Sequence, residues 1–320
     1  MPAHPPAAGS AAEPRRGQQT PSGCAHYSEH MSTSYTDDVR LAHVLADDAD
    51  SLTMDRFRAR DLRVSKKPDM TEVTDADEAV EQAIRRTLGR SRSRDVVHGE
   101  EFGVSGTGTR RWIIDPIDGT RNYLRGVPIW ATLIALVDED EVVASCVSAP
   151  ALGRRWWASK DGGAWTGKSL MSARQCRVSH VDSLSDASLS YSSLSGWDDI
   201  DKQEQFLALA RRVWRTRAYG DFWSYMLLAE GAVDIAAEPE LAVWDMAALD
   251  VIVREAGGLF GGLDGSSGPW AGNALATNGH LHEDVMAFLG HFPDRPAKAE
   301  PRGSASVTEL TSRRRPPESE

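Results

Sequence analysis

The order of helical and strand-like segments is the feature that most restricts how this chain can fold. Apolar residues recur with helical spacing over residues 36–52 and 74–88. Strand-like runs follow at 112–114, 129–137 and 141–148. Three acidic residues separate the last two runs, which predicts a β-hairpin there.

The second half of the chain repeats this mixture of helices and strands. Helical spacing recurs at 206–214, 222–230 and 244–256, and a strand-like run lies at 233–237. Glycines follow the last two helical segments, as is typical of helix C-termini. Because helices and strands do not alternate strictly, the pattern predicts an α+β fold with layers arranged in two lobes.

Composition divides the chain into four parts. Residues 1–36 and 293–320 lack hydrophobic periodicity and are predicted to be a disordered extension and a disordered tail. Residues 37–165 are predicted to form an N-terminal α+β lobe with most of the metal ligands, and residues 166–292 a C-terminal α/β lobe. Met31 precedes the first periodic segment, so Met1 and Met31 are alternative starts.

Charge and composition narrow the classes of partner. The 320 residues are 41% hydrophobic and 26% charged, as in an ordinary globular protein. A net charge of −11 argues against nucleic acid or an anionic membrane surface as the main partner. Three dispersed cysteines, the lack of a signal sequence and the lack of a membrane-length apolar run predict a soluble cytoplasmic protein.

An acidic run, residues 115–120, ends one of the predicted strands. Asp115 closes the apolar stretch, Pro116 is expected to end the strand's hydrogen-bond ladder, and Asp118 follows three residues later. Two carboxylates at a strand end can converge on a hard divalent cation such as Mg²⁺. A helix opening at Gly119 would add free backbone N–H groups for an anion. The same residue types also dominate turns, so the run alone leaves a simple turn open.

Four more acidic residues favour a metal site over a simple turn. Glu100 and Glu101 lie in a glycine-bracketed loop upstream, and Asp245 lies in the first turn of a predicted helix. Asp77 lies at another helix start, where it could be only a capping residue, as Asp245 could. Taken together with the run at 115–120, these residues indicate one shared acidic site.

These segments resemble the inositol monophosphatase family. Glu100-Glu101, residues 115–120, Trp244-Asp245 and residues 255–258 occur in the family's order and at comparable spacing. The resemblance spans roughly residues 37–289. It implies a layered α-β-α-β-α sandwich and a homodimer. It also implies hydrolysis of a small phosphate monoester by direct attack of water, assisted by two or three Mg²⁺ ions.

The resemblance also implies roles for individual residues. The expected metal ligands are four carboxylates and one carbonyl oxygen: Glu100, Asp115, Ile117, Asp118 and Asp245. Thr120 and Glu100 would orient the attacking water, and Asp77 would support metal-bound water from outside. The backbone of Gly119 and Thr120 would hold the phosphate.

Substrate contacts are expected from the second lobe, close to Asp245. Glu238 stands where the family has an acidic residue facing the substrate. Asp221 adds a carboxylate beside aromatic residues, which suits a cationic substrate. Arg217 is expected to orient the substrate, with surface charge or an interface as its alternatives.

Three further segments resemble the actinobacterial histidinol-phosphatases within this family: residues 148–157, 191–197 and 214–223. This resemblance implies hydrolysis of L-histidinol phosphate in histidine biosynthesis. Inositol phosphate, fructose 1,6-bisphosphate and 3′-phosphoadenosine nucleotides stay open as other substrates. A non-catalytic role as a partner of the transcription machinery also stays open. The full set of acidic residues argues against that role, because an unused carboxylate cluster only repels itself.

Overall fold

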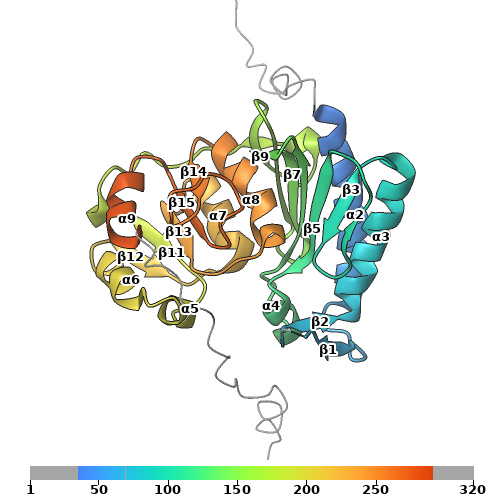
Figure 1. The fold of residues 1–320 in the computed structure, drawn as a ribbon, viewed down its shortest axis with the longest axis horizontal. Coiled ribbons are helices and arrows are strands. Elements are labelled where there is room, and N and C mark those ends of the chain that lie inside the picture. Colours follow the sequence, from blue (N-terminus) through green and yellow to red (C-terminus); the bar gives the residue numbers. More distant parts are fainter. Residues whose placement is uncertain (1–34, 69, 291–320) are drawn as a thin grey trace, which may run out of the picture. The chain divides into compact units, whose positions relative to one another are not determined.

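Two β-sheets organise residues 35–68 and 70–290, the part of the chain that this computed structural model describes (Figure 1). The larger sheet has the strand order β10-β9-β8-β7-β6-β5-β3-β4, and only β3 and β5 pair in parallel. Its strands are β3 (Val96–Gly99), β4 (Gly103–Ser105), β5 (Arg111–Asp118), β6 (Ala131–Asp138), β7 (Glu141–Ala149), β8 (Arg154–Ser159), β9 (Gly163–Thr166) and β10 (Arg174–Gln175).

The smaller sheet has the order β12-β11-β13-β15-β14. Its strands are β11 (Ser188–Ser190), β12 (Arg215–Arg217), β13 (Ile235–Glu238), β14 (Leu259–Gly261) and β15 (Ala274–Thr277). Strand β11 runs parallel to β12 and β13, whereas β15 runs antiparallel to β13 and β14. A separate two-stranded hairpin joins β1 (Val64–Lys66) to β2 (Glu72–Thr74).

Helices cover both faces of both sheets. The helices α2 (Thr36–Arg56) and α3 (Asp75–Ser91) pack on one face of the larger sheet, and α7 (Asp221–Ala229) and α8 (Val243–Glu255) lie between the two sheets. The outer face of the smaller sheet packs against α5 (Ser195–Asp199), α6 (Gln203–Ala210) and α9 (His282–Leu289). The predicted α+β fold, a layered α-β-α-β-α sandwich, is therefore confirmed.

Period-two alternation along the central strands explains this layering. Trp112, Ile114 and Ile134 are buried against α2 and α3, whereas their neighbours Ile113 and Leu133 are buried against α7 and α8. Successive side chains of a strand point to opposite faces, so a strand that is apolar throughout requires cover on both sides. The remaining short elements are α4 (Thr120–Arg125) and the 3₁₀ turns at Pro150–Leu152, Leu170–Ser172 and Leu184–Asp186.

Most predicted elements are present, with differences at their ends. The hairpin of β6 and β7 is confirmed, and α2 begins at Thr36. Helix α6 ends at Ala210 instead of reaching 214, because the chain must turn into the edge strand β12, and this turn leaves Trp214 exposed. None of the described helices is both long and apolar enough to cross a bilayer.

The predicted lobes and tails are not tested by these elements. The division at 165/166 stays a prediction, and the larger sheet itself continues through β10. The predicted extension (1–36) and tail (293–320) lie outside the described residues, except for Tyr35 and Thr36.

Strand β5 does not stop at Pro116, as the sequence had suggested. It continues to Asp118 through a break in register with β6, between the pairs Asp115–Leu133 and Asp118–Ala131. Such a bulge tolerates a proline, which cannot donate to the ladder. The hydroxyl of Thr132 donates to the Pro116 carbonyl at 2.8 Å and holds the bulge in place.

We predict that Thr132→Val destabilises the fold through this bulge. The side chain is fully buried, so its loss leaves the Pro116 carbonyl without its donor and costs about 1–3 kcal/mol. Urea denaturation monitored by circular dichroism measures the change. Thr53→Val is the control, because the hydroxyl of Thr53 donates to Ala49 inside α2, where the helix ladder also satisfies that carbonyl. An equal loss in both variants would contradict the role of the bulge.

Candidate active site

Three carboxylates converge at the end of β5. Oxygen atoms of Asp115, Asp118 and Asp245 all lie within 4.8 Å of one another. Residues three apart on a regular strand face opposite sides, so the bulge is what brings Asp115 and Asp118 to the same side. Asp115 also accepts a hydrogen bond from the Ile117 backbone N–H at 2.9 Å, which fixes its carboxylate.

The layer of helices between the sheets completes this carboxylate cluster. Asp245 lies in the first turn of α8 and accepts a hydrogen bond from the Ala242 N–H at 2.7 Å. The N-terminal end of a helix favours a negative charge at this position. At the start of α7, the Phe222 N–H donates to Asp118 at 2.7 Å. The cluster is therefore held by backbone groups from both helices.

The chain turns sharply after Asp118 and enters α4. Gly119 has φ 81°, a left-handed conformation that favours glycine, and it stands at the N-terminal boundary of α4. Thr120 donates from its hydroxyl to the Ile117 carbonyl at 3.0 Å. The structure thus brings Ile117, Gly119 and Thr120 together beside the carboxylates, as the sequence predicts.

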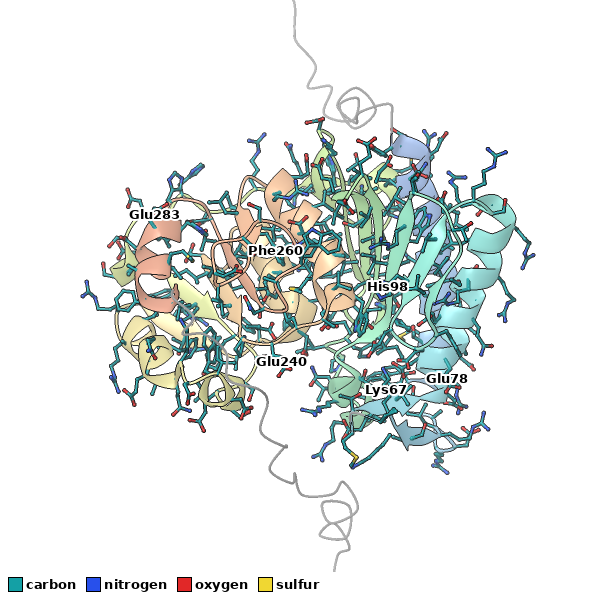
Figure 2. All side chains as sticks on the ribbon, viewed as in Figure 1. Lys67, Glu78, His98, Glu240, Phe260 and Glu283 are labelled. Carbon is teal, nitrogen blue, oxygen red and sulfur yellow. The ribbon has the colours of Figure 1, made fainter. Side chains whose placement is uncertain are left out.

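Glu100 and Glu101 lie in the loop between β3 and β4 and share one cation. The ammonium of Lys67, in the β1–β2 hairpin (Figure 2), lies 2.6 Å from Glu100 and 2.9 Å from Glu101. Burial is the main cause that raises the pKa of Glu101 to about 7. The Glu100 carboxylate also lies beside Asp115 and contributes, after burial, to the raised pKa of that residue.

The loop that carries Glu100 is positioned by a buried glutamate on α3. Glu81 accepts hydrogen bonds from the backbone N–H groups of Glu101 at 2.7 Å and Phe102 at 3.2 Å, and it pairs with Arg85. A Cβ at Gly99 would lie 2.0 Å from the Glu81 carboxylate, so this approach requires glycine. Sequence reasoning missed Glu81 and Lys67, because neither stands in a recognisable motif.

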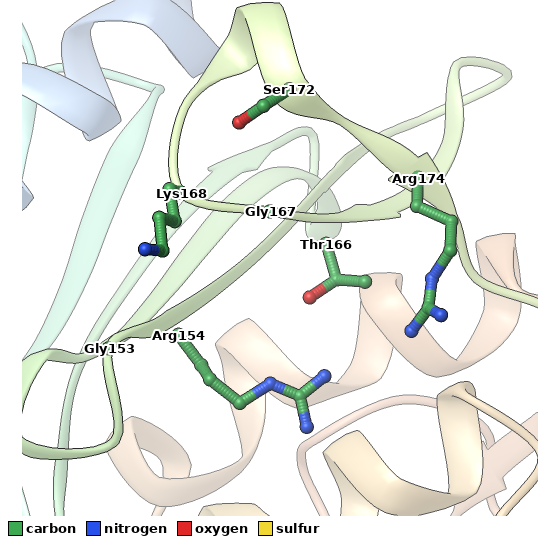
Figure 3. A pocket seen from close by; sticks show the side chains of 7 residues that line it. All are labelled: Gly153, Arg154, Thr166, Gly167, Lys168, Ser172 and Arg174. Atoms are coloured by element: carbon green, nitrogen blue, oxygen red, sulfur yellow. The ribbon is translucent and has the colours of Figure 1, made fainter.

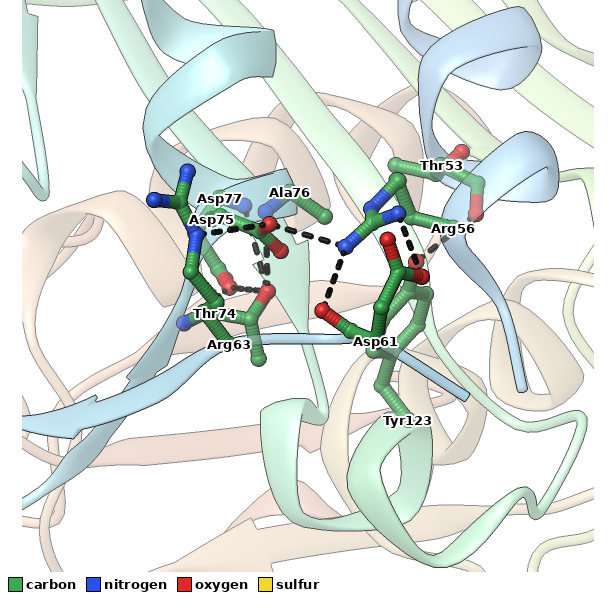
Figure 4. A network of polar contacts seen from close by, with 9 residues as sticks. All are labelled: Thr53, Arg56, Asp61, Arg63, Thr74, Asp75, Ala76, Asp77 and Tyr123. Carbon is green, nitrogen blue, oxygen red and sulfur yellow. Dashed lines mark hydrogen bonds and ion pairs between the residues drawn. The ribbon is translucent and has the colours of Figure 1, made fainter. Parts of the chain in front are cut away.

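Asp77 is a capping residue and also a buried acid near the cluster. It accepts a hydrogen bond from the Thr74 N–H at 2.8 Å in a capping box at the start of α3 (Figure 4). Neighbouring Asp75 is tied to the end of α2 by Arg56 at 2.9 Å. Burial raises the pKa of Asp77 to about 6, and among the described residues its second oxygen has no hydrogen-bond partner.

Two further carboxylates adjoin the cluster. Asp221 has φ 49°, an uncommon conformation for aspartate, and accepts a hydrogen bond from the Asn122 side chain at 3.0 Å. Burial raises the pKa of Asp221 to about 6. Burial, and then the charge of Asp221, raise the pKa of Glu238 to about 8. Both residues act electrostatically on Asp118, so they belong to the same negative region.

Arg217 is the predicted site residue that the structure does not bring into contact with the carboxylates. It ends β12, and its guanidinium is exposed and donates to the Thr216 carbonyl at 2.7 Å. Because β12, β11 and β13 pair in parallel, their C-terminal ends lie at the same end of the smaller sheet. Arg217 therefore lies at the same end of the sheet as Glu238. Its role in substrate orientation stays a prediction.

The electrostatics of the cluster suit a divalent cation. Burial raises the pKa of Asp115 and Asp118 well above the usual range, and it raises the pKa of Asp245 to about 7. Each shift means that negative charge is disfavoured there unless a cation compensates it. Clustered carboxylate oxygens beside a free carbonyl lone pair are the donors that Mg²⁺ prefers. The residues present therefore fit a hard metal ion.

We predict that removing one of these charges stabilises the metal-free protein. Asp118→Asn keeps an acceptor for the Phe222 N–H and relieves repulsion from its acidic neighbours. The melting temperature in EDTA should rise by a few degrees, since about 1 kcal/mol corresponds to about 2–4 °C in a domain of this size.

Asp250→Asn is the matched control for this experiment. Asp250 is a buried carboxylate of α8 that pairs with Arg254 at 2.9 Å, so its neutralisation should lower the melting temperature. Differential scanning fluorimetry measures both variants. A fall in both would show that Asp118 is not under net repulsion.

Comparison with known proteins places this geometry in a family. The chain matches the inositol monophosphatase family over residues 36–292. It is 64% identical over 259 residues to a histidinol-phosphatase of Streptomyces coelicolor, covering 80% of this chain and 97% of that protein. A histidinol-phosphatase of Mycobacterium tuberculosis is 58% identical over 254 residues, covering 79% and 98%. Among solved structures, an inositol monophosphatase from Zymomonas mobilis matches with a TM-score of 0.71 at 30% identity, covering 81% of this chain and 99% of that one. This chain therefore belongs to the inositol monophosphatase family.

Proposed function

We propose that this protein hydrolyses L-histidinol phosphate to L-histidinol and inorganic phosphate. The observation that carries the proposal is that two further buried acidic residues lie beside the cluster of three aspartates. Asp221 and Glu238 add two carboxylates to a region that already holds Asp115, Asp118 and Asp245. A substrate with a phosphate at one end and cationic groups at the other fits this arrangement. The identity to two histidinol-phosphatases supports the same substrate.

The carboxylate cluster would hold two or three Mg²⁺ ions. The proposed ligands are those that the family resemblance implies: Glu100, Asp115, the Ile117 carbonyl, Asp118 and Asp245. When bound, such ions neutralise phosphate oxygens, generate a nucleophile from water at neutral pH and stabilise the leaving alkoxide. The Asp115 carboxylate adjoins Glu100, Asp118 and Asp245, so it would be suited to bridge two ions.

The residues around the cluster would orient the reactants. The Thr120 hydroxyl donates its hydrogen bond to the Ile117 carbonyl, so its oxygen is free to accept a hydrogen bond from the attacking water. Glu100 would accept a second hydrogen bond from that water and take up the one proton that it loses on attack. The backbone N–H groups of Gly119 and Thr120 would hold the phosphate, and Asp77 would fix water through its unpaired oxygen.

Recognition of the leaving group would fall to Glu238 and Asp221. Histidinol carries an ammonium and an imidazole, both of which can donate to carboxylates. Glu238 keeps its proton at neutral pH while no cation is near, because its pKa is raised to about 8. An ammonium bound beside it would favour the ionised form and lower that pKa. Binding of the cationic substrate would therefore ionise Glu238 and form an ion pair with it.

Other functions fit these residues less well. Inositol phosphate has a neutral polyol as its leaving group, so it would not supply the cation that favours the ionised forms of Asp221 and Glu238. A non-catalytic binding protein would gain nothing from five converging carboxylates. For assembly, we propose a homodimer, as the family resemblance implies. For location, we propose the cytoplasm, as the dispersed cysteines of the sequence suggest.

Asp115→Asn should abolish turnover while the fold is retained. Loss of the bridging carboxylate should lower kcat/KM by at least about 10³-fold in magnesium buffer, measured as phosphate release. Asp140→Asn, in the exposed β6–β7 turn, is the control and should keep normal activity. Near-normal turnover of Asp115→Asn would refute the proposed metal ligands.

Asp221→Asn should alter substrate choice rather than general activity. Loss of a charged hydrogen bond is worth about 1.5–3 kcal/mol, so kcat/KM for L-histidinol phosphate should fall about 10- to 100-fold. Hydrolysis of inositol 1-phosphate should stay the same or rise. Asp201→Asn is the matched control, because Asp201 is an exposed aspartate that also has positive φ, at 56°. An equal loss for both esters would rule out Asp221 as a specificity residue.

A further inference from the structure

A basic pocket lies outside the carboxylate cluster. It has a volume of about 330 Å³, and Figure 3 shows the residues that line it: Gly153, Arg154, Thr166, Gly167, Lys168, Ser172 and Arg174. None of them belongs to the metal or substrate residues described above. The pocket is therefore a separate feature of the fold that the proposed activity does not use.

The charge of this pocket is opposite to that of the protein. Three cationic side chains, Arg154, Lys168 and Arg174, line it, and Glu230 pairs with the two arginines. Three positive charges against one negative charge leave an excess of two. In a chain with a net charge of −11, such a local reversal attracts anions to one place.

Two contacts fix the orientation of the Arg154 guanidinium. Its guanidinium lies 4.8 Å from the centre of the Trp156 ring and pairs with Glu230, which also accepts a hydrogen bond from the Trp156 indole at 2.6 Å. Its side chain is one-third exposed and lines the pocket. A guanidinium that is already oriented loses little freedom when it binds an oxyanion.

The other two cations are weakly engaged. Arg174 is 74% exposed and lies 4.0 Å from Glu230, which is too long for a strong hydrogen bond. Among the described residues, no carboxylate forms an ion pair with Lys168. Figure 3 shows Thr166 between the two arginines. Its hydroxyl donates a hydrogen bond to the Arg155 carbonyl at 3.0 Å. The pocket thus offers unused donors around a small volume.

The pocket lies at the same sheet end as the active site. Through the antiparallel ladders of β6, β7, β8 and β9, the end of β5 with Asp118 is also the end where β8 begins at Arg154 and β10 at Arg174. Strands are spaced about 4.8 Å apart, so β8 lies roughly 14 Å from β5. Helix α7 connects the two places, since Phe222 contacts Asp118 and Glu230 contacts Arg154.

We propose that this basic pocket binds a small phosphate dianion, either free or as a monoester. Two guanidinium groups can each offer paired N–H donors to phosphate oxygens, and Lys168 adds a point charge. The resident carboxylate of Glu230 competes with the ligand for both arginines. The site does not depend on the proposed substrate or on metal binding, so it stands or falls separately from the proposed function.

Isothermal titration of the full-length protein with inorganic phosphate in EDTA tests the proposal. Without divalent cations the carboxylate cluster repels phosphate, so saturable binding reports the basic pocket. Arg174→Ala should weaken binding by about tenfold or more, since it removes an exposed guanidinium. Glu230→Gln should tighten binding severalfold, because it removes the competing charge and keeps a hydrogen-bond acceptor.

Arg177→Ala is the matched control, because Arg177 is an exposed arginine three residues from Arg174 that does not line the pocket. Its phosphate affinity should equal that of the wild type. Equal weakening by Arg174→Ala and Arg177→Ala, or no saturable binding to the wild type, would overturn the proposal.

The same titration with L-histidinol phosphate in EDTA, where no metal supports turnover, distinguishes the two sources of the dianion. Tighter binding of the ester than of phosphate, again lost in Arg174→Ala, assigns the pocket to a phosphate monoester. Equal affinities assign it to free phosphate. Failure of both probes to respond to Arg174→Ala overturns the site, whatever the activity of the enzyme.

Discussion

Converging negative charge at the end of β5 is the constraint on which the rest of this structure depends. Two like charges about 4 Å apart repel by about 4 kcal/mol at an effective dielectric constant of 20. Asp115, Asp118 and Asp245 meet within 4.8 Å, and Asp221 and Glu238 adjoin them. Backbone N–H groups hold the three aspartates in place, which offsets part of the repulsion. The remaining charge would favour a bound cation.

The layered architecture brings the acidic residues of this site together from different elements. The bulge of β5 turns two aspartates to one side, and the middle helical layer brings Asp245 from α8 and Asp221 from α7. The chain provides a cation of its own at Glu100 and Glu101, where Lys67 pairs with both. It provides no such partner among the described residues at the three aspartates. A metal ion and a cationic substrate would supply the positive charge that the three aspartates lack.

Local signals made much of the site predictable from the sequence. The run at 115–120 and the early-helix position of Asp245 were expected to converge, and they do. The reason for their convergence was not predictable, because the bulge is a break in the pairing of β5 with β6, where Thr132 of the neighbouring strand donates to the Pro116 carbonyl. Glu81 and Lys67 were missed for the same reason, since their partners are distant in the chain. Helix α6 was predicted too long because apolar spacing does not register the turn into β12.

The central claim is that Asp115, Asp118 and Asp245 form a divalent metal site. A crystal structure of the protein grown with Mn²⁺ tests it most directly, because manganese gives an anomalous signal that marks its position. The account predicts an anomalous peak among these three carboxylates and a second one beside Glu100. Anomalous peaks found only elsewhere, at a manganese concentration that supports activity, would contradict it.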